Sequence, residues 1–124
     1  MATFTNRATL SYNGRTTDSN IVTGTIQQTL SVTKTAVIDE YSAGDEIVYV
    51  INLINSGTAQ FTDVTLGDDL GSFIEDTLTL VPLSYVDGSA QYYVNGVLQP
   101  APSVTSGTDL VIGGITVPAG GNAT

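Results

Sequence analysis

The chain has 124 residues, of which three are basic and twelve acidic, and its formal net charge is −9 with no cysteine and no histidine. The length predicts one domain that buries a real core, while the acidic balance argues against nucleic acid and anionic membranes as partners. Without cysteine there is no disulfide or thiolate site, and without histidine the commonest general base and metal ligand is missing.

The chain carries no recognisable export or membrane signal. No apolar run approaches the roughly 18 residues of a membrane span, so we expect no membrane insertion. The first seven residues lack the basic start and apolar centre of a signal peptide. We therefore expect either export by another route or a mature fragment.

Residues 3–12 alternate between an apolar and a threonine-rich face, which predicts a half-buried strand. The apolar face holds Phe4, Asn6, Ala8, Leu10 and Tyr12. Asn13-Gly14 predicts a turn. A weaker strand is expected over 19–27, and a third over 29–37 with Leu30, Val32, Lys34 and Ala36 on one face.

The stretch 46–54 is the strongest strand signal in the chain. Of the eight residues 47–54, all but Asn52 are β-branched, aromatic or leucine, types that fit a pleated surface. Both alternating faces are apolar, which is typical of a strand covered on both sides. We expect it to be the central strand of a β-sandwich.

Turn signals and short strands fill the rest of the chain. After a turn at 55–57, strands are expected at 60–66, 77–81, 84–86, 109–112 and 115–117, with an acidic loop at 67–76 and a hairpin over 89–99. Asn95-Gly96 forms the tip of that hairpin, because a type I′ turn needs two positive φ angles. The chain stops at residues 120–124, which resemble a turn leading into a further strand. Turn spacing of about 8–12 residues without helical periodicity predicts an all-β, antiparallel sandwich.

Several short motifs carry a family resemblance. They are Lys34-Thr35, Ala43-Gly44-Asp45, Tyr49, Asn55-Ser56-Gly57, Val64-Thr65, Asp68-Asp69-Leu70, Tyr92-Tyr93-Val94-Asn95-Gly96 and Val117-Pro118-Ala119-Gly120. On these, residues 30–124 resemble a repeat domain of unknown function from bacterial and archaeal surface proteins. The resemblance implies an immunoglobulin-like sandwich, strung in tandem on extracellular proteins, with a structural or adhesive role and no catalytic residues.

The order of the elements departs from that family. There, the Pro-Ala-Gly turn precedes an Asn-x-Ala-Thr-Leu strand and one more strand. Here, similar strands stand at the front, as Asn6-Arg7-Ala8-Thr9-Leu10 and Ser19-Asn20-Ile21-Val22-Thr23. The resemblance therefore divides the chain into a strand extension, residues 1–28, and a sandwich body, residues 29–124.

Three acidic pairs are candidate chemical sites: Asp39-Glu40, Asp45-Glu46 and Asp68-Asp69. Neighbours on a strand point to opposite faces, so no pair converges as glycosidase carboxylates do. Calcium on Asp63, Asp68 and Asp69 is a weaker alternative, because the EF-hand spacing is missing. We expect solvated loop charge, no metal and no cofactor.

Lys34 is the only lysine, and alternation places it on an apolar face. Surface sandwich domains sometimes join such a lysine to an asparagine in an autocatalytic crosslink, and Asn6 is an imaginable acceptor. We favour the alternative that the aliphatic part of the Lys34 side chain lies on the sheet while its ammonium group stays in water. The six tyrosines are candidates for a surface on which carbohydrate rings stack. We expect instead that they pack in the core and across neighbouring strands.

The family resemblance and the strand patterns together favour a non-enzymatic structural subunit of an extracellular filament or surface assembly on a bacterial cell or spore surface. Copies would assemble by donating N-terminal strands, a form of donor-strand complementation. The alternative is a monomeric module that binds glycans or a host surface. The expected assembly residues are Phe4, Asn6, Ala8, Leu10, Tyr12, Ile21, Val22 and Ile26.

Overall fold

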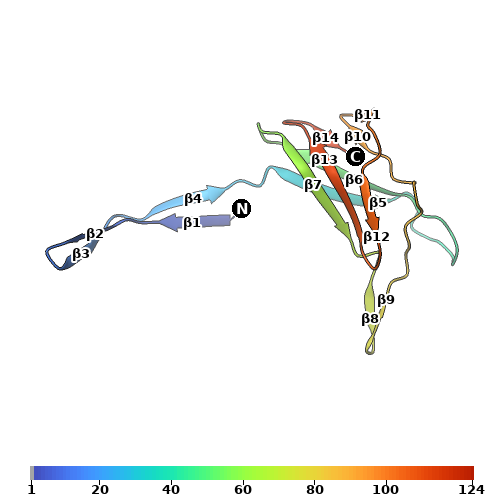
Figure 1. Ribbon diagram of the computed structural model, residues 1–124, viewed down its shortest axis with the longest axis horizontal. Coiled ribbons are helices and arrows are strands. Elements are labelled where there is room, and N and C mark those ends of the chain that lie inside the picture. Colours follow the sequence, from blue (N-terminus) through green and yellow to red (C-terminus); the bar gives the residue numbers. More distant parts are fainter. Residues whose placement is uncertain (1) are drawn as a thin grey trace.

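The computed structural model describes residues 2–124, which form fourteen strands and no helix (Figure 1). Every strand pair is antiparallel. The prediction of an all-β antiparallel fold is therefore confirmed.

The N-terminal strands form a two-stranded ribbon that points away from the rest of the chain (Figure 1). In its inner half, β1 (Ala2–Asn6) pairs with β4 (Val22–Ile26). In its outer half, β2 (Thr9–Tyr12) pairs with β3 (Arg15–Asp18). Asn13-Gly14 closes the tip with φ angles of 47° and 72°, the left-handed pair that a tight hairpin needs.

The prediction of one half-buried strand over 3–12 is wrong in two respects. The strand is interrupted between Asn6 and Thr9, and every residue from 2 to 23 is exposed. The cause is the tight Asn13-Gly14 turn, which pairs residues 9–12 with the unpredicted strand 15–18 instead of the body. The predicted strand 19–27 is present as the shorter β4.

Two larger sheets make up the body. The first has the order β11 (Val97–Leu98), β10 (Tyr93–Val94), β14 (Asn122–Ala123), β6 (Tyr49–Asn55), β5 (Leu30–Ala36). The second has the order β12 (Ser103–Ser106), β13 (Leu110–Val117), β7 (Phe61–Asp68). A separate hairpin joins β8 (Phe73–Glu75) to β9 (Leu78–Leu80).

Several body elements differ from the sequence expectation. The two strands expected at 109–112 and 115–117 are one strand, β13, whose register shifts between Ile112 and Ile115. Gly114 absorbs this bulge with a φ of 73°. Residues 84–86 form no strand, β8 lies within the stretch 67–76 that was predicted as a loop, and β12 was not predicted. The hairpin tip at Asn95-Gly96 has the two positive φ angles, 48° and 80°, that were predicted.

The core lies where β6 of the first sheet meets β13 of the second. Its buried members are Leu53, Ile115, Val117 and Ala123. Strand β6 is internal to its sheet, as predicted, but it is covered on one face only. Its other face leaves Val50 and Ile54 39% and 46% exposed, because the described chain packs no second layer there.

A buried amide fixes the end of β6. Asn55 is 1% exposed, and its Nδ2 donates to the carbonyl oxygens of Ala59 at 2.8 Å and Val117 at 3.2 Å. Its Oδ1 accepts the amide of Gly57 at 2.9 Å. One side chain thus holds β6, the following turn and β13 together, and every strong hydrogen-bonding group it carries is satisfied.

We predict that Asn55→Ala destabilises the chain by about 2–3 kcal/mol, because it leaves two carbonyls and an amide without their partner in a buried site. Urea unfolding followed by circular dichroism measures the change. The neighbouring Ser56→Ala, at an exposed position, is the control. Equal midpoints for the two variants would contradict the role given to Asn55.

Candidate functional site: a projecting ribbon and an open groove

The inner half of the ribbon has one apolar and one hydroxyl-rich face. Residues directly opposite each other on antiparallel strands share a face. The pairs Ala2–Ile26, Phe4–Gly24 and Asn6–Val22 make one face. The pairs Thr3–Thr25 and Thr5–Thr23 make the other. The ribbon is therefore amphipathic, although no other part of the described chain covers its apolar face.

Phe4 and Gly24 fit each other across the ribbon. A Cβ atom at position 24 would collide with the Phe4 ring, so only glycine leaves room for the ring to lie across the opposite strand. Such pairing of an aromatic ring with a glycine covers backbone that is otherwise bare. Phe4 nevertheless remains 54% exposed, so its outer ring face is free for another contact.

The outer half of the ribbon carries its positive charge. Arg7 forms an ion pair with Asp18 at 2.9 Å between Nη1 and Oδ2. At the tip, Arg15 lies opposite Tyr12. Arg15 is the one basic side chain among residues 2–124 without a carboxylate oxygen within 4.0 Å. The tip thus presents an aromatic ring and an unpaired cation on the same face.

The structure brings all eight predicted assembly residues onto this ribbon. Phe4, Asn6, Leu10, Tyr12, Val22 and Ile26 lie on its strands, while Ala8 and Ile21 lie at the joint between its halves. All are exposed, Ile21 by 63%. An isolated two-stranded ribbon is marginally stable in water, and no other part of the described chain packs on this apolar surface.

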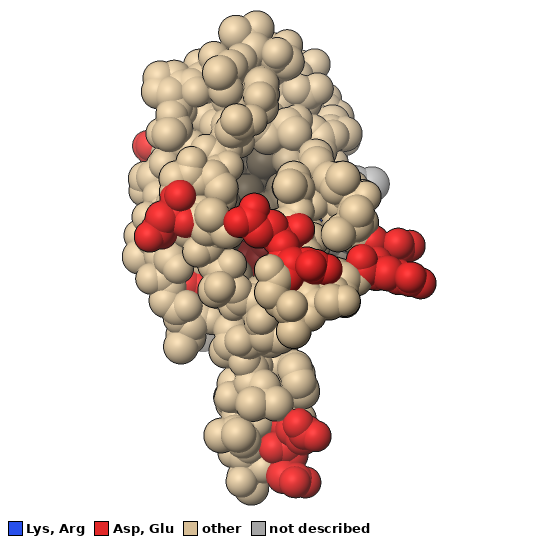
Figure 2. Space-filling view, turned by 90° about the vertical axis from the view of Figure 1, so that its right-hand side faces the viewer, with Lys and Arg blue, Asp and Glu red and all other residues tan. Residues whose placement is uncertain are grey.

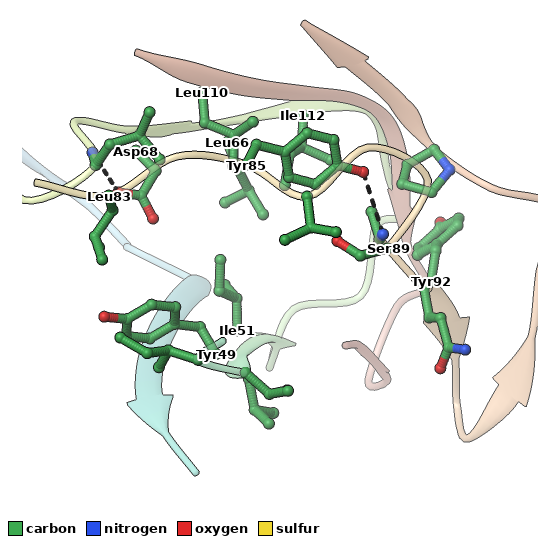
Figure 3. Close-up of a pocket in the computed structure, with 18 of the residues that line it drawn as sticks. Tyr49, Ile51, Leu66, Asp68, Leu83, Tyr85, Ser89, Tyr92, Leu110 and Ile112 are labelled. Carbon is green, nitrogen blue, oxygen red and sulfur yellow. Dashed lines mark hydrogen bonds between the residues drawn. The ribbon is translucent and has the colours of Figure 1, made fainter. Parts of the chain in front are cut away.

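The body contains an open groove that the sequence did not reveal. It encloses about 660 Å³ between the two larger sheets. Figure 3 shows Tyr49 and Ile51 of β6 on one side, facing Leu66 of β7 and Leu110 and Ile112 of β13 on the other. The segment 82–93, largely without strand structure, runs along its edge. Protein interiors are normally close-packed. The side chains that line a groove of this size therefore lack contacts that they would make in a filled core.

The tyrosines at the groove are mostly engaged in the fold. The Tyr92 hydroxyl donates to the carbonyl oxygen of Thr116 at 3.0 Å and lies 2.7 Å from the Thr116 amide. The Tyr85 hydroxyl accepts the Ala90 amide at 3.2 Å (Figure 3). The Tyr49 ring has the Lys34 ammonium 4.3 Å from its centre, a cation–π contact.

Lys34 pairs with Asp68, which joins β5 to β7 and hence the first sheet to the second. Its other neighbour is the Tyr49 ring. The imagined partner Asn6 lies instead on the projecting ribbon (Figure 1). Partial burial acts to raise the pKa of Asp68, but the hydrogen bonds from Lys34 and Leu70 and the charge of Lys34 lower it below 3.8 overall.

We predict that this pair adds stability that depends on pH. A carboxyl with a lowered folded-state pKa stabilises the fold above its ordinary value of 3.8, and the effect disappears as the pH falls through the lower folded-state value. Asp68→Asn should therefore cost about 1 kcal/mol or less at pH 7. The difference in melting temperature from the parent chain should shrink below pH 3.8. Asp39→Asn is a loop control for net charge, and a difference that grows in acid would contradict the pairing.

We also predict that the Lys34–Asp68 contact stays an ion pair. Amide formation needs a neutral amine and a protonated carboxyl, whereas the hydrogen bonds and the charge around Asp68 favour its ionised form. Intact mass should equal the sequence mass. Loss of about 18 Da for a bond to Asp68, or about 17 Da for a bond to an asparagine, would show a crosslink if Lys34→Ala abolished it.

Two of the three acidic pairs contribute a hydrogen bond to a turn. The Asp45 Oδ2 accepts the amide of Ser42 at 2.7 Å, and the Asp69 Oδ1 accepts that of Gly71 at 3.0 Å. Among residues 2–124, no three acidic side chains are grouped so as to hold a metal ion. Figure 2 shows acidic side chains gathered around a hollow on one face of the body, with no basic side chain visible beside them.

Comparison of the chain with family models, with curated proteins and with solved structures gave no match. Residues 2–124 include no helix long and apolar enough to cross a bilayer.

Proposed function

We propose that this chain is a structural subunit of an extracellular filament or surface assembly. The N-terminal ribbon of one copy completes the body of the next. The observation that carries the proposal is the ribbon itself: an arm with an apolar face that no described part of its own chain covers. Soluble proteins rarely leave such a face without a partner.

The proposal treats residues 29–124 as an immunoglobulin-like sandwich with room for added strands, and residues 1–28 as the donated extension. The open groove between the sheets supports this division. Strand addition supplies main-chain hydrogen bonds and fills pockets with alternate side chains. The ribbon offers both, because its outer edges are unpaired and its apolar residues alternate with threonines.

The direction of donation favours a filament. A ribbon that enters a different surface on the next copy makes a heterologous contact, and such contacts propagate until they close into a ring or extend as a fibre. Each buried Phe, Leu, Ile or Val side chain adds about 1.5–3 kcal/mol before the cost of association. Several such side chains on one ribbon are sufficient for a stable joint.

We propose that the assembly lies outside a bacterial cell, on the surface of the cell or of a spore. Two features support this location: the family resemblance, and a surface rich in threonine and serine. The assembly needs no cofactor and no catalytic residue, because strand pairing and apolar burial are its whole chemistry.

The second candidate is a monomeric module that binds glycans or a host surface. The tyrosines lining the groove favour it, since aromatic rings stack on sugars. Against it, the hydroxyls of Tyr85 and Tyr92 are already hydrogen-bonded within the fold, and Lys34 covers one face of Tyr49. A monodisperse monomer that binds glycans would favour this candidate over assembly.

We predict that truncation to a chain starting at Thr29 abolishes assembly. The full chain should form concentration-dependent fibres in negative-stain electron micrographs, and the truncated chain should not. A peptide of residues 2–27 added in trans should raise the melting temperature of the truncated body, because it returns the missing apolar cover. The same peptide added to the full chain should shorten the fibres by capping them.

A scrambled peptide of the same composition is the control for these additions. Circular dichroism of the truncated body reports whether it keeps its strand structure. A truncated chain that still forms fibres, or whose melting temperature is not raised by the peptide, would overturn the proposal.

A further inference from the structure

Strand β6 is paired unequally on its two sides. On one side, β5 pairs with all seven of its residues, from Tyr49 to Asn55. On the other side, β14 pairs with Leu53 and Ile54 only. In the described chain, residues 49–52 of an internal strand thus have a free edge, which we call the slot.

The backbone groups of Tyr49 and Ile51 point into this slot. Alternate residues of a strand direct their N–H and C=O groups to opposite sides. The even-numbered Val48 and Ser56 bond toward β5, through Val37 and Thr29. The amide of Asn55 bonds in the other direction, to the carbonyl oxygen of Gly121 at 2.9 Å. Tyr49 and Ile51 are odd-numbered, like Asn55. Their backbone N–H and C=O groups therefore point to the same side as those of Asn55, where β14 does not reach.

The slot and the groove are parts of one site. The side chains of Tyr49 and Ile51 line the groove beside the free backbone edge. A strand placed in the slot would extend the line of β14 past Thr124, which also borders the groove. Its inward side chains would enter the apolar space, while its other side chains would join the exposed outer face of Val50 and Asn52.

We propose that the slot accepts β1 of a second copy, with Phe4 inserted into the groove. This inference rests on the proposed function and specifies the acceptor site for the ribbon. Strand β1 has five residues, a free outer edge and an alternation of Ala2, Phe4 and Asn6 with Thr3 and Thr5. Strand β4 is a poorer donor, because only the three residues 27–29 separate it from β5 of its own body.

The charges of the two parts favour this contact and oppose others. Two arginines and one aspartate give residues 1–28 a formal charge of +1, while one lysine and eleven carboxylates give residues 29–124 a charge of −10, which together make −9. Two bodies therefore repel each other. The ribbon is the one part of the chain that an acidic body attracts, and Asp45 and Glu46 stand at the groove.

Engineered cysteines test the acceptor site directly, because the chain has none of its own. Thr5 lies on the ribbon face opposite Phe4. With Phe4 in the groove, Thr5 should therefore lie beside Val50 or Asn52 on the outer face of β6. Cross-strand neighbours have Cβ atoms close enough for a disulfide. Mild oxidation of a mixture of Thr5→Cys chains with Val50→Cys or Asn52→Cys chains should give a covalent heterodimer on a non-reducing gel.

The matched acceptor is Thr33→Cys on the free edge of β5, the strand that pairs with β6 on its other side. Crosslinking to Thr33 and not to Val50 or Asn52, in chains that form fibres, would overturn the slot while the proposed function stands. Fibres without a crosslink to any of the three positions would also overturn it. Absence of both fibres and crosslinks would remove the proposed function and the slot together.

A second pair of variants keeps the test independent of disulfide geometry. Phe4→Asp should reduce the assembled fraction about tenfold or more in sedimentation at fixed concentration, because it removes the apolar side chain that enters the groove. Thr16→Asp adds the same charge at an exposed position in the outer half of the ribbon, outside β1, and should change the assembled fraction about twofold or less. Equal losses in the two variants would show a charge effect and overturn the insertion of Phe4.

Discussion

The body depends on the buried amide of Asn55. It hydrogen-bonds three backbone groups in two different segments, and its own strand β6 is the strand to which both β5 and β14 attach. The position of β13 against β6 follows from the bond to Val117, and with it the separation of the two sheets. An apolar side chain of similar size would fill the space but satisfy none of these groups. The groove keeps its shape because this end of the sandwich is fixed.

The two unusual surfaces of the chain are complementary. The ribbon is a pair of strands with an apolar face and no layer to cover it, and the groove is a space between layers with no strand to fill it. In a sequence whose local patterns otherwise agree with its fold, conflicts of this kind concentrate where function lies. Asp68 lines the groove, and its ion pair with Lys34 is a charged link between the two sheets at that point.

Sequence patterns predicted local structure better than they predicted packing. The alternation from Phe4 to Tyr12 gave the correct shared face for Phe4 and Asn6, but alternation says nothing about what covers a face. The ribbon was therefore mistaken for a half-buried strand. Strand β3 was missed because Thr16 and Thr17 have no apolar alternation, and only pairing across Asn13-Gly14 makes them a strand. Positive φ at Asn95-Gly96 was predictable, since the dipeptide itself favours that turn.

Contacts between segments far apart in the chain could not be predicted from the sequence. Lys34 was correctly placed on an apolar face, yet its partner lies 34 positions away, where no local pattern could identify it. The groove was unpredictable for the same reason, because it depends on the spacing of two sheets. The Asn55-Ser56-Gly57 turn was visible, but the reach of Asn55 to Val117 was not, since only the packing of β13 brings that carbonyl close.

The unequal pairing of β6 has a mechanical consequence for a chain of subunits. In the proposed filament, tension on a subunit's ribbon would pass through residues 27–29 into β5, and from β5 across the seven-residue ladder into β6. The next subunit's ribbon would pull on the opposite edge of that same strand, so the load would cross one strand from edge to edge. The sheet of β7, β12 and β13 would lie outside this path, and it could stay packed against the inserted strand while the fibre is stretched.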